Sequence, residues 1–363
     1  MKIAFFMLHE ALPYAGVVRP FINWSKKLSE DHEVYFLLLN CGIELVNFVK
    51  SMGNIRDYVI TNTPSKLTRF VETIKPDILI TDDYIVRLKT LQKIKDNVSV
   101  KTCIYVQVLF GIHSIVDVYH PVFLRERVLF TLAKLVPFNI FKIQYKKLLQ
   151  KHDIIIANSG ITATLLHTLY GIEPHGVVYP PVDTEIFKFQ NVKKKDQVLL
   201  YLGSHAGDTD ENFVKEICKI LKNKDMKILV MGNKTLQEKL LKEFEIQAVS
   251  GVSDEELAKV YSECKLTICP QKWEQFGYVV AESIACGTPV LAFNMMGPKE
   301  IIEKTRLGFL VNNKKEFLDI LENIEKEKSL TVSLTNKIEN FPFSITYSSE
   351  KLLEVVFHEK STP

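Results

Sequence analysis

Short apolar runs alternate with longer amphipathic stretches from one end of the chain to the other. Such runs, separated by stretches of helical periodicity, are typical of parallel strands that helices cover on both faces. The pattern therefore predicts an α/β protein with doubly wound parallel sheets. The expected strands are 3–8, 33–39, 78–81, 100–106 and 154–157 in the first half of the chain, and 197–202, 227–231, 266–269 and 290–293 in the second.

The length of the chain, 363 residues, exceeds what one hydrophobic core usually holds, so we expect two domains of this type. The boundary is expected near residues 180–187, where two prolines interrupt the pattern, and the polar stretch 190–196 reads as a linker. We therefore assign residues 1–188 to the first domain and 189–344 to the second.

The composition is that of an ordinary globular protein, with 47% apolar and 25% charged residues. The net charge of +3 argues against general nucleic-acid binding. Six cysteines are scattered without a Cys-x-x-Cys pair, which favours reduced core residues and argues against a zinc site. The start of the chain lacks a cleavage site and no apolar run reaches a membrane span, so we expect a cytoplasmic protein that could still lie on the inner face of a membrane.

The most informative segment is 269–293. It predicts a strand that ends at Pro270, a polar loop through Gly277, a helix closed by Gly287 and a second strand. Glu274 precedes the helix, and Glu282 falls in its second turn. The N-terminus of a helix attracts phosphate, so two acids beside it could hold hydroxyl groups on either side of a diphosphate. This arrangement indicates a site for a sugar nucleotide.

The residues Glu274-Gln-Phe-Gly-Tyr-Val-Val-Ala-Glu282, followed by Ala-Cys-Gly-Thr-Pro-Val at 285–290, carry a family resemblance. They resemble the Glu-x7-Glu signature of retaining glycosyltransferases of family 4 type, the glycosyl transferases group 1, which have the GT-B fold. The resemblance implies two Rossmann-like domains facing a cleft. It also implies that the last helix, expected in 345–363, crosses back to the first domain.

The resemblance also implies roles on the donor side. Glu282 would bind the ribose hydroxyls, and Glu274 would hold hydroxyls of the transferred sugar and so act in catalysis. Ser253 and Glu256 lie beside the expected base position, but they read better as the capping box of a helix. The further donor-binding candidates are Gly16, Gly203, Ser204, Val252, Lys272, Phe276, Gly277, Tyr278 and Val279.

One departure from the family concerns the charge of the diphosphate. The family places an arginine and then a lysine after the glycine that ends the first strand of this domain, whereas residues 203–212 contain neither. An unpaired buried charge is costly, so another group must stabilise the diphosphate, or the donor is of another kind. The groups that could do so are Lys272, Lys299, Arg19, His205 and the helix start at Gly277. Lys272 reads equally well as an exposed surface lysine.

In the first domain, the loop after strand 100–106 contains His113, our choice for a second catalytic residue, with Gln107 as the next candidate. The resemblance implies transfer with retention, in which the acceptor hydroxyl attacks the face that the diphosphate leaves. A covalent route through a carboxylate is conceivable, but no second acid is suggested as its partner. We expect no metal and no cofactor beyond a UDP- or GDP-linked sugar, and we interpret Asp82-Asp83 as loop structure.

Residues 123–151 combine large apolar side chains with many lysines and arginines and contain one acid. Basic amphipathic segments lie in membrane interfaces, which would suit a lipid-linked glycan acceptor. A pair of core helices with a basic outer face explains the pattern equally well, and Pro137 would separate the two helices.

The leading interpretation is a hexosyltransferase-type enzyme that moves a sugar from a nucleotide sugar to a hydroxyl of a glycan or a lipid-linked glycan. One alternative is another GT-B enzyme, such as a nucleotide-sugar epimerase. A second alternative, suggested by the missing arginine and lysine, is a catalytically silent sugar-nucleotide binder or partner subunit.

Overall fold

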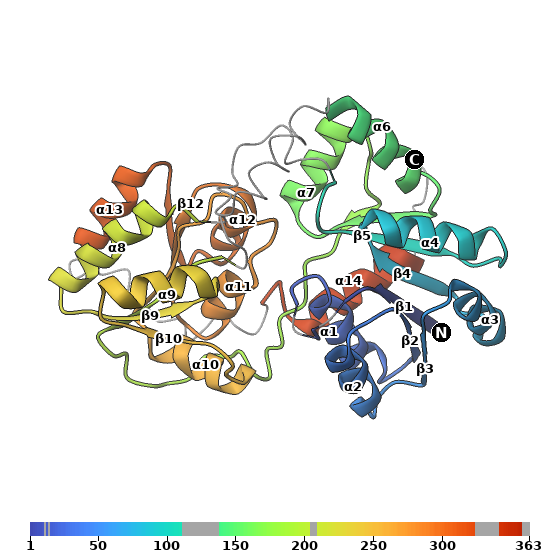
Figure 1. The fold of residues 1–363 in the computed structure, drawn as a ribbon, viewed down its shortest axis with the longest axis horizontal. Helices are drawn as coiled ribbons and strands as arrows, with labels where there is room; N and C mark the ends of the chain where they lie inside the picture. The colour runs from blue at the N-terminus through green and yellow to red at the C-terminus, as the bar shows by residue number, and fades with distance from the viewer. Residues whose placement is uncertain (11, 14, 111–137, 204–208, 324–340, 358–363) are drawn as a thin grey trace. The chain divides into compact units, whose positions relative to one another are not determined.

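The computed structural model describes residues 1–10, 12–13, 15–110, 138–203, 209–323 and 341–357 (Figure 1). The described residues form two compact units, and each unit is built on one parallel sheet. Of the described residues, the first unit contains those up to Pro181 and those from Phe343, and the second unit contains those from Val182 to Pro342. The predicted α/β class with two doubly wound parallel sheets is therefore confirmed.

The first unit contains a seven-stranded sheet in the order β3-β2-β1-β4-β5-β6-β7, with every neighbouring pair parallel. Consecutive strands are joined by helices, as parallel pairing requires. The strands are β1 (Lys2–Leu8), β2 (Glu33–Leu39), β3 (Asp57–Thr61), β4 (Ile78–Asp82), β5 (Thr102–Val106), β6 (Ile154–Ala157) and β7 (Gly176–Val177), and the helices are α1 (Arg19–Leu28), α2 (Ile43–Ser51), α3 (Pro64–Ile74), α4 (Ile85–Lys95), α6 (Phe138–Leu149), α7 (Gly160–Leu165) with the π-turn η2 (Leu166–Tyr170), and α14 (Ile345–Phe357).

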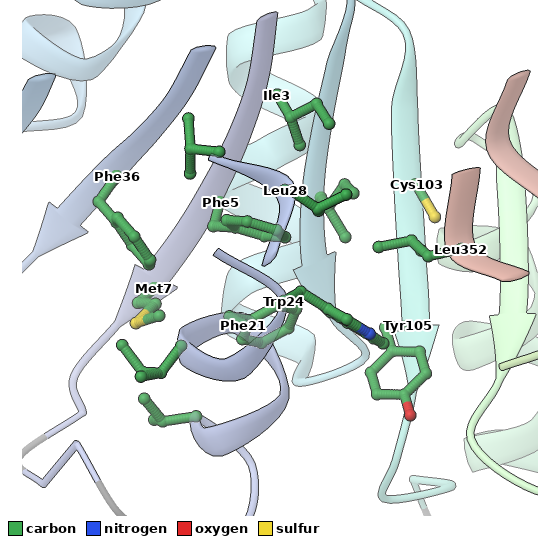
Figure 2. Packing of buried hydrophobic residues seen from close by; sticks show 14 of the residues in the cluster. Ile3, Phe5, Met7, Phe21, Trp24, Leu28, Phe36, Cys103, Tyr105 and Leu352 are labelled. Carbon is green, nitrogen blue, oxygen red and sulfur yellow. The ribbon is translucent and has the colours of Figure 1, made fainter. Parts of the chain in front are cut away.

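The core of the first unit fills the space between the sheet and the helices α1 and α14. Figure 2 shows Phe5 of β1 between Phe36 of β2 and Phe21 of α1. Its ring is tilted against each of the other two, with centroids 5.6 Å apart in both pairs. Trp24 packs edge-on against Tyr105 of β5 at 4.8 Å. Aromatic pairs in this geometry add to the burial of apolar area, so this cluster fixes α1 on the sheet.

The C-terminal helix α14 belongs to the first unit, as predicted. Leu352 and Val356 are buried in the same core as Phe5. The indole nitrogen of Trp24 donates a hydrogen bond to the hydroxyl oxygen of Ser348 at 2.8 Å, and the ammonium of Lys101 donates to the carbonyl oxygen of Val356. The last helix of the chain thus completes a core that the first residues begin.

The second unit contains a six-stranded parallel sheet in the order β10-β9-β8-β11-β12-β13. Four of its six described helices begin at Asp, Asn or Ser caps, whose side chains accept amide groups that the first turn leaves unpaired. The helices that begin at Tyr278 and Met296 have no side-chain cap. Ser253 and Glu256 form the predicted capping box of α10. The strands are β8 (Gln197–Tyr201), β9 (Lys227–Met231), β10 (Ile246–Ala248), β11 (Leu266–Cys269), β12 (Val290–Phe293) and β13 (Gly308–Val311), and the helices are α8 (Glu211–Asn223), α9 (Lys234–Glu243), α10 (Asp254–Glu263), α11 (Tyr278–Ala285), α12 (Met296–Thr305) and α13 (Lys314–Glu322).

The predicted strands all form, with bounds that differ by two residues at most. Four observed strands were not predicted: β3, β7, β10 and β13. These four are the edge strands of the two sheets. Edge strands are short and partly exposed, and β3 and β10 contain polar residues that interrupt the apolar run. β7 has only two residues, whereas β13 is apolar and was missed.

The cysteines are free thiols, as predicted, and all but Cys41 are buried. Burial raises the pKa of the buried thiols well above its usual value, so they stay protonated at neutral pH. Among the helices of the described residues, none is both long and apolar enough to cross a bilayer.

Removal of a large side chain from α14 is expected to destabilise the first unit. Leu352→Ala leaves a cavity under α1 and should lower the free energy of unfolding by about 2–5 kcal/mol, as measured by denaturant titration. Tyr347→Ala on the same helix is the matched control, because its side chain is 49% exposed and its loss should change stability by less than about 0.5 kcal/mol. Equal effects of the two variants would contradict the packing of α14.

The stability of the first unit should fall as the pH is lowered from about 6.5 to about 4. Burial and the charge of Lys95 lower the pKa of His152 to about 4, so protonation of this histidine favours the unfolded chain over that interval. His152→Leu should therefore show a smaller loss of stability between pH 7 and pH 5 than the unchanged protein, when denaturation midpoints are compared. Equal losses of stability in His152→Leu and in the unchanged protein would contradict this assignment.

Candidate active site

The loops after β8 and β11 meet where the strand order of the second sheet reverses. From β8 the chain continues to β9 on one side, whereas β11 pairs on the other side. Ligands of open α/β sheets bind at such a point, outside the carboxyl ends of the strands. The amide nitrogen of Gln271 donates to the carbonyl oxygen of Tyr201 at 2.6 Å and to the hydroxyl of Thr209 at 3.2 Å, so it joins the two loops. Gln271 was not among the predicted site residues, although it lies within the segment 269–293.

The left-handed backbone of Gly277 places Glu274 beside the start of α11. Gly277 has a φ of 101°, which an L side chain rarely adopts, and it stands directly before the first helical residue, Tyr278. A Cβ atom at Gly277 would lie 3.3 Å from the Cγ atom of Glu274. The loop therefore folds back on itself, and the first predicted carboxylate lies at the N-terminal end of the helix.

The second predicted carboxylate, Glu282, lies in the second turn of α11 and is 1% exposed. The hydroxyl of Tyr261, from α10, donates to its Oε2 atom at 3.2 Å. Tyr261 was not predicted as part of the site, because its distance of 21 residues in sequence gives no local signal. Its hydrogen bond orients a carboxylate that is buried in the helix layer.

The loop that carries Glu274 rests on the start of the next helix, α12. The backbone amide of Gly297 donates to the carbonyl oxygen of Glu274 at 2.9 Å. A Cβ atom at Gly297 would lie 2.2 Å from the carbonyl oxygen of Phe276, which leaves room for glycine only. Phe276 is itself buried, and its ring packs edge-on against that of Tyr278 at 5.5 Å. Gly297 is thus a structural part of the site that the motif did not reveal.

Two glycines bring the ends of β8 and β9 into close contact. The carbonyl oxygen of Gly203 accepts a hydrogen bond from the amide of Asn233 at 2.9 Å. A Cβ atom at Gly232 would lie 2.3 Å from the same oxygen. Gly203 therefore has a defined place at the switch point. Ser204 and His205 lie outside the described residues.

The other donor-side candidates surround this loop in different settings. The ammonium of Lys272 lies over the ring of Phe293, 5.6 Å from its centroid, and its side chain is exposed. Val279 is half-buried in the first turn of α11. Val252 is exposed and directly precedes the capping box of α10. Lys299 forms an ion pair with Glu303 within α12.

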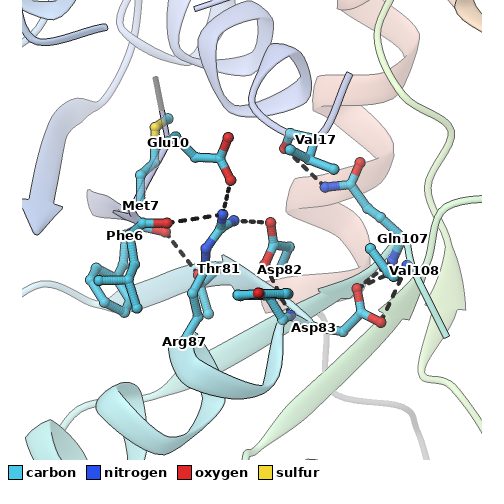
Figure 3. A network of polar contacts seen from close by, with 12 residues as sticks. Phe6, Met7, Glu10, Val17, Thr81, Asp82, Asp83, Arg87, Gln107 and Val108 are labelled. Atoms are coloured by element: carbon cyan, nitrogen blue, oxygen red, sulfur yellow. Dashed lines mark hydrogen bonds and ion pairs between the residues drawn. The ribbon is translucent and has the colours of Figure 1, made fainter. Parts of the chain in front are cut away.

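The first sheet also reverses its strand order, between β1 and β4, and a buried charge network occupies the ends of these strands (Figure 3). The guanidinium of Arg87 contacts the carboxylates of Asp82 and Glu10 and donates to the carbonyl oxygen of Leu8 at 3.1 Å. Burial raises the pKa of Asp82 to about 7, while Arg87 opposes that shift. The network fixes the start of the loop that follows β1.

The neighbouring Asp83 holds the loop after β5. Its carboxylate accepts the backbone amides of Gln107, Val108 and Leu109, and it also accepts the hydroxyl of Tyr145 at 2.6 Å. Figure 3 shows the contacts of Asp83 with Gln107 and Val108. Both aspartates are engaged by groups of the protein. The interpretation of Asp82-Asp83 as loop structure is wrong for Asp82, which is the last residue of β4.

The remaining candidates of the first unit lie near this network or beyond the described residues. The side-chain amide of Gln107 donates to the carbonyl oxygen of Val17 at 3.0 Å, so it joins the loops after β5 and β1. Gly16 is exposed, and a Cβ atom there would meet no atom within 4 Å. Arg19 begins α1. His113 and residues 123–137 lie outside the described residues.

Comparison with known families identifies the class of the second unit. Residues 182–341 match the family described as glycosyl transferases group 1. This segment spans the second unit, and the two units have the GT-B fold.

Individual relatives are more distant. A mouse protein named GDP-Man:Man(3)GlcNAc(2)-PP-Dol alpha-1,2-mannosyltransferase is 25% identical over 267 residues, which are 65% of this chain and 53% of the mouse protein. D-inositol 3-phosphate glycosyltransferase of Rhodococcus erythropolis is 27% identical over 197 residues, 46% of this chain and 44% of that protein. The chain spans about half the length of the curated relatives it matches.

Similar solved structures cover nearly the whole chain. HepE of Anabaena, in complex with UDP and glucose, aligns with a TM-score of 0.71 at 15% identity over 98% of each chain. Sucrose-phosphate synthase of Thermosynechococcus elongatus aligns with the same TM-score at 13% identity, again over 98% of each chain. At these identities the likeness shows the fold alone.

Substitution of Gly297 tests the support of the Glu274 loop. Gly297→Ala forces a Cβ atom against the Phe276 carbonyl and should lower the free energy of unfolding by about 1–3 kcal/mol. Gly53→Ala is the matched control, since a Cβ atom there meets nothing within 4 Å and should leave stability nearly unchanged. A Gly297→Ala variant as stable as the unchanged protein, by denaturant titration, would contradict the close contact.

Proposed function

We propose that the protein transfers a sugar from a nucleotide sugar to a hydroxyl group of a glycan or a lipid-linked glycan, with retention of configuration and without a metal ion. The observation that carries this proposal is the arrangement around α11. Glu274 lies at the N-terminal end of the helix, Glu282 lies within it, and both stand at the switch point of the second sheet. The family match over the same residues supports the proposal.

In this proposal the donor lies along the start of α11. The first turn of a helix offers amide groups and a partial positive charge, so Gly277, Tyr278 and Val279 bind the diphosphate. Glu282 accepts hydrogen bonds from the ribose, and Glu274 holds hydroxyls of the sugar. Gly203 and Gly232 allow the backbone at the ends of β8 and β9 to approach closely, which leaves space for the nucleotide over the sheet.

The charge of the diphosphate requires a cation from outside residues 203–212, because these residues contain neither arginine nor lysine. Lys272 is the candidate that the fold favours. It lies in the loop after β11, and its position over Phe293 keeps the ammonium at the carboxyl ends of β11 and β12. Its exposure allows the side chain to turn toward a bound phosphate.

The proposed reaction is a substitution at the anomeric carbon. The bond between that carbon and the diphosphate oxygen breaks, a bond to the acceptor oxygen forms on the same face, and the hydroxyl proton passes to the departing phosphate. The protein contributes by holding the two reactants in place and by stabilising the charge of the leaving group. The networks of Arg87 and Asp83 give the first unit a fixed arrangement of loops for the acceptor.

The names of similar proteins support a nucleotide sugar and a lipid-linked glycan as reactants. The mouse relative is named for GDP-Man and Man(3)GlcNAc(2)-PP-Dol, and HepE was solved with UDP and with UDP-glucose. These names leave the base open between UDP and GDP. A lipid-linked acceptor would place the protein at the inner face of a membrane, in peripheral contact through residues 123–151.

Substitution of the two glutamates is expected to separate binding from turnover. Glu282→Ala should weaken binding of the donor and of the free nucleotide alike, because the ribose is common to both. Glu274→Ala should reduce turnover by about 100-fold or more with a smaller change in nucleotide binding, because it acts on the sugar. Calorimetry measures the binding, and slow donor hydrolysis without acceptor measures the turnover. Glu238→Ala, at an exposed glutamate of α9, is the control.

The donor for this experiment is selected by a thermal-shift screen of UDP-, GDP- and ADP-sugars. Normal turnover in both glutamate variants would refute the site assignment. Nucleotide binding without any donor hydrolysis or transfer would instead favour a catalytically silent sugar-nucleotide binder. The absence of arginine and lysine from residues 203–212 is the observation that favours this alternative.

A further inference from the structure

Two neighbouring helices of the first unit contain no acidic residue. α4 has the sequence IVRLKTLQKIK and α6 the sequence FNIFKIQYKKLL, and the two helices pack against each other (Figure 1). In a protein with nearly equal numbers of basic and acidic residues, 46 and 43, this is a local excess of positive charge. A basic surface of this kind attracts an anionic partner.

The outward faces of the two helices repeat one pattern. Val86, Lys89 and Lys93 are exposed on α4 at spacings of three and four residues, and Ile140, Ile143 and Lys147 are exposed on α6 at the same spacings. Residues at these spacings lie on one face of a helix. We call these six residues the α4–α6 surface.

The apolar members of this surface lie toward the same end of the sheet. α4 leads into β5 and α6 leads into β6, and because β5 and β6 are parallel, the two helices run in the same direction. Val86, Ile140 and Ile143 belong to their N-terminal halves, with exposed fractions of 44%, 47% and 54%. Lys93 and Lys147 belong to the C-terminal halves, and Lys89, Lys93 and Lys147 have no ion pair with any residue that the structure describes.

The inner face of α6 is fixed, so its outer face has a defined orientation. Tyr145 and Leu149 are fully buried, and the Tyr145 hydroxyl donates to Asp83 at 2.6 Å. Phe141 packs edge-on against Phe110 at 5.3 Å. Ile140 and Ile143 therefore cannot turn inward, because that side of the helix is already filled.

We propose that the α4–α6 surface binds the headgroup region of a membrane that contains anionic lipid. Isoleucine and valine side chains at the N-terminal ends of the helices enter the boundary between headgroups and acyl chains, and the lysines behind them contact the lipid phosphates. Charge complementarity favours this occupant, because the lysines attract the negative charge of the lipid phosphates. A purely apolar protein partner would form no ionic contact with these lysines. The inference deepens the proposed function, because a lipid-linked acceptor lies in such a membrane.

The test is sedimentation of the full-length protein with vesicles, in the absence of donor and acceptor. The protein should bind vesicles of phosphatidylcholine mixed with phosphatidylglycerol at low salt, and it should bind pure phosphatidylcholine vesicles at least tenfold more weakly. High salt should release it. The double variant Lys93→Glu/Lys147→Glu and the double variant Ile140→Ser/Ile143→Ser should each lose about tenfold or more in partition to the mixed vesicles.

Matched controls come from the second unit. Lys219→Glu/Lys222→Glu on α8 and Leu241→Ser on α9 change exposed residues of the same types and should leave binding unchanged. All substituted positions are exposed, so folding is expected to survive, and equal thermal unfolding midpoints confirm it.

Three results would overturn the proposal. They are absence of binding to the mixed vesicles at low salt, equal loss in the α8 and α9 controls, and unchanged binding of the isoleucine variant, which would indicate ionic attraction alone. Because vesicle binding is measured without transfer, its failure would leave the proposed reaction untouched. Loss of transfer in the glutamate variants would likewise leave vesicle binding intact.

Discussion

The amide of Gly297 reaches the carbonyl oxygen of Glu274 across a contact between two backbones that leaves no space for a Cβ atom. The candidate site depends on this contact. It ties the start of α12 to the loop before α11, and the left-handed Gly277 then turns that loop so that Glu274 lies beside the helix end. A side chain at either glycine would move the carboxylate, although neither glycine carries a group that could bind a ligand. The position of the Glu274 carboxylate is thus set by two glycines.

The switch points of the two sheets are held by different kinds of polar groups. In the second unit, the neutral side chains of Gln271 and Thr209 join the loops after β8 and β11. The acids of the segment 269–293 are therefore the two glutamates of the motif. In the first unit, the guanidinium of Arg87 and the carboxylate of Asp82 are buried together beside the partly buried Glu10, and Asp83 adds its own hydrogen bonds. Buried ion pairs add little stability but are costly to break, so the network of the first unit fixes loop geometry rather than strengthening the fold.

Much of the fold could be predicted from the sequence because a central parallel strand is apolar on both faces. The four strands that escaped prediction are the four edges, where one side of the strand lacks a neighbour and polar residues are tolerated. The candidate site followed from one motif with a helix start in its middle. Gly297, Gln271 and Tyr261 could not be derived in the same way, because their roles depend on contacts between segments that no local pattern relates. His113 and Ser204 stay predictions.

Helix α14 has a consequence for the order in which the protein folds. Synthesis proceeds from the N-terminus, yet the core that contains Phe5 and Trp24 also contains Leu352 and Val356, which are made after every described residue of the second unit. The second unit, whose described residues lie between the two parts of the first, is available in full before that core can close. The first unit must therefore wait with part of its apolar surface uncovered. A nascent chain of this protein has its C-terminal unit ready first and its N-terminal unit last.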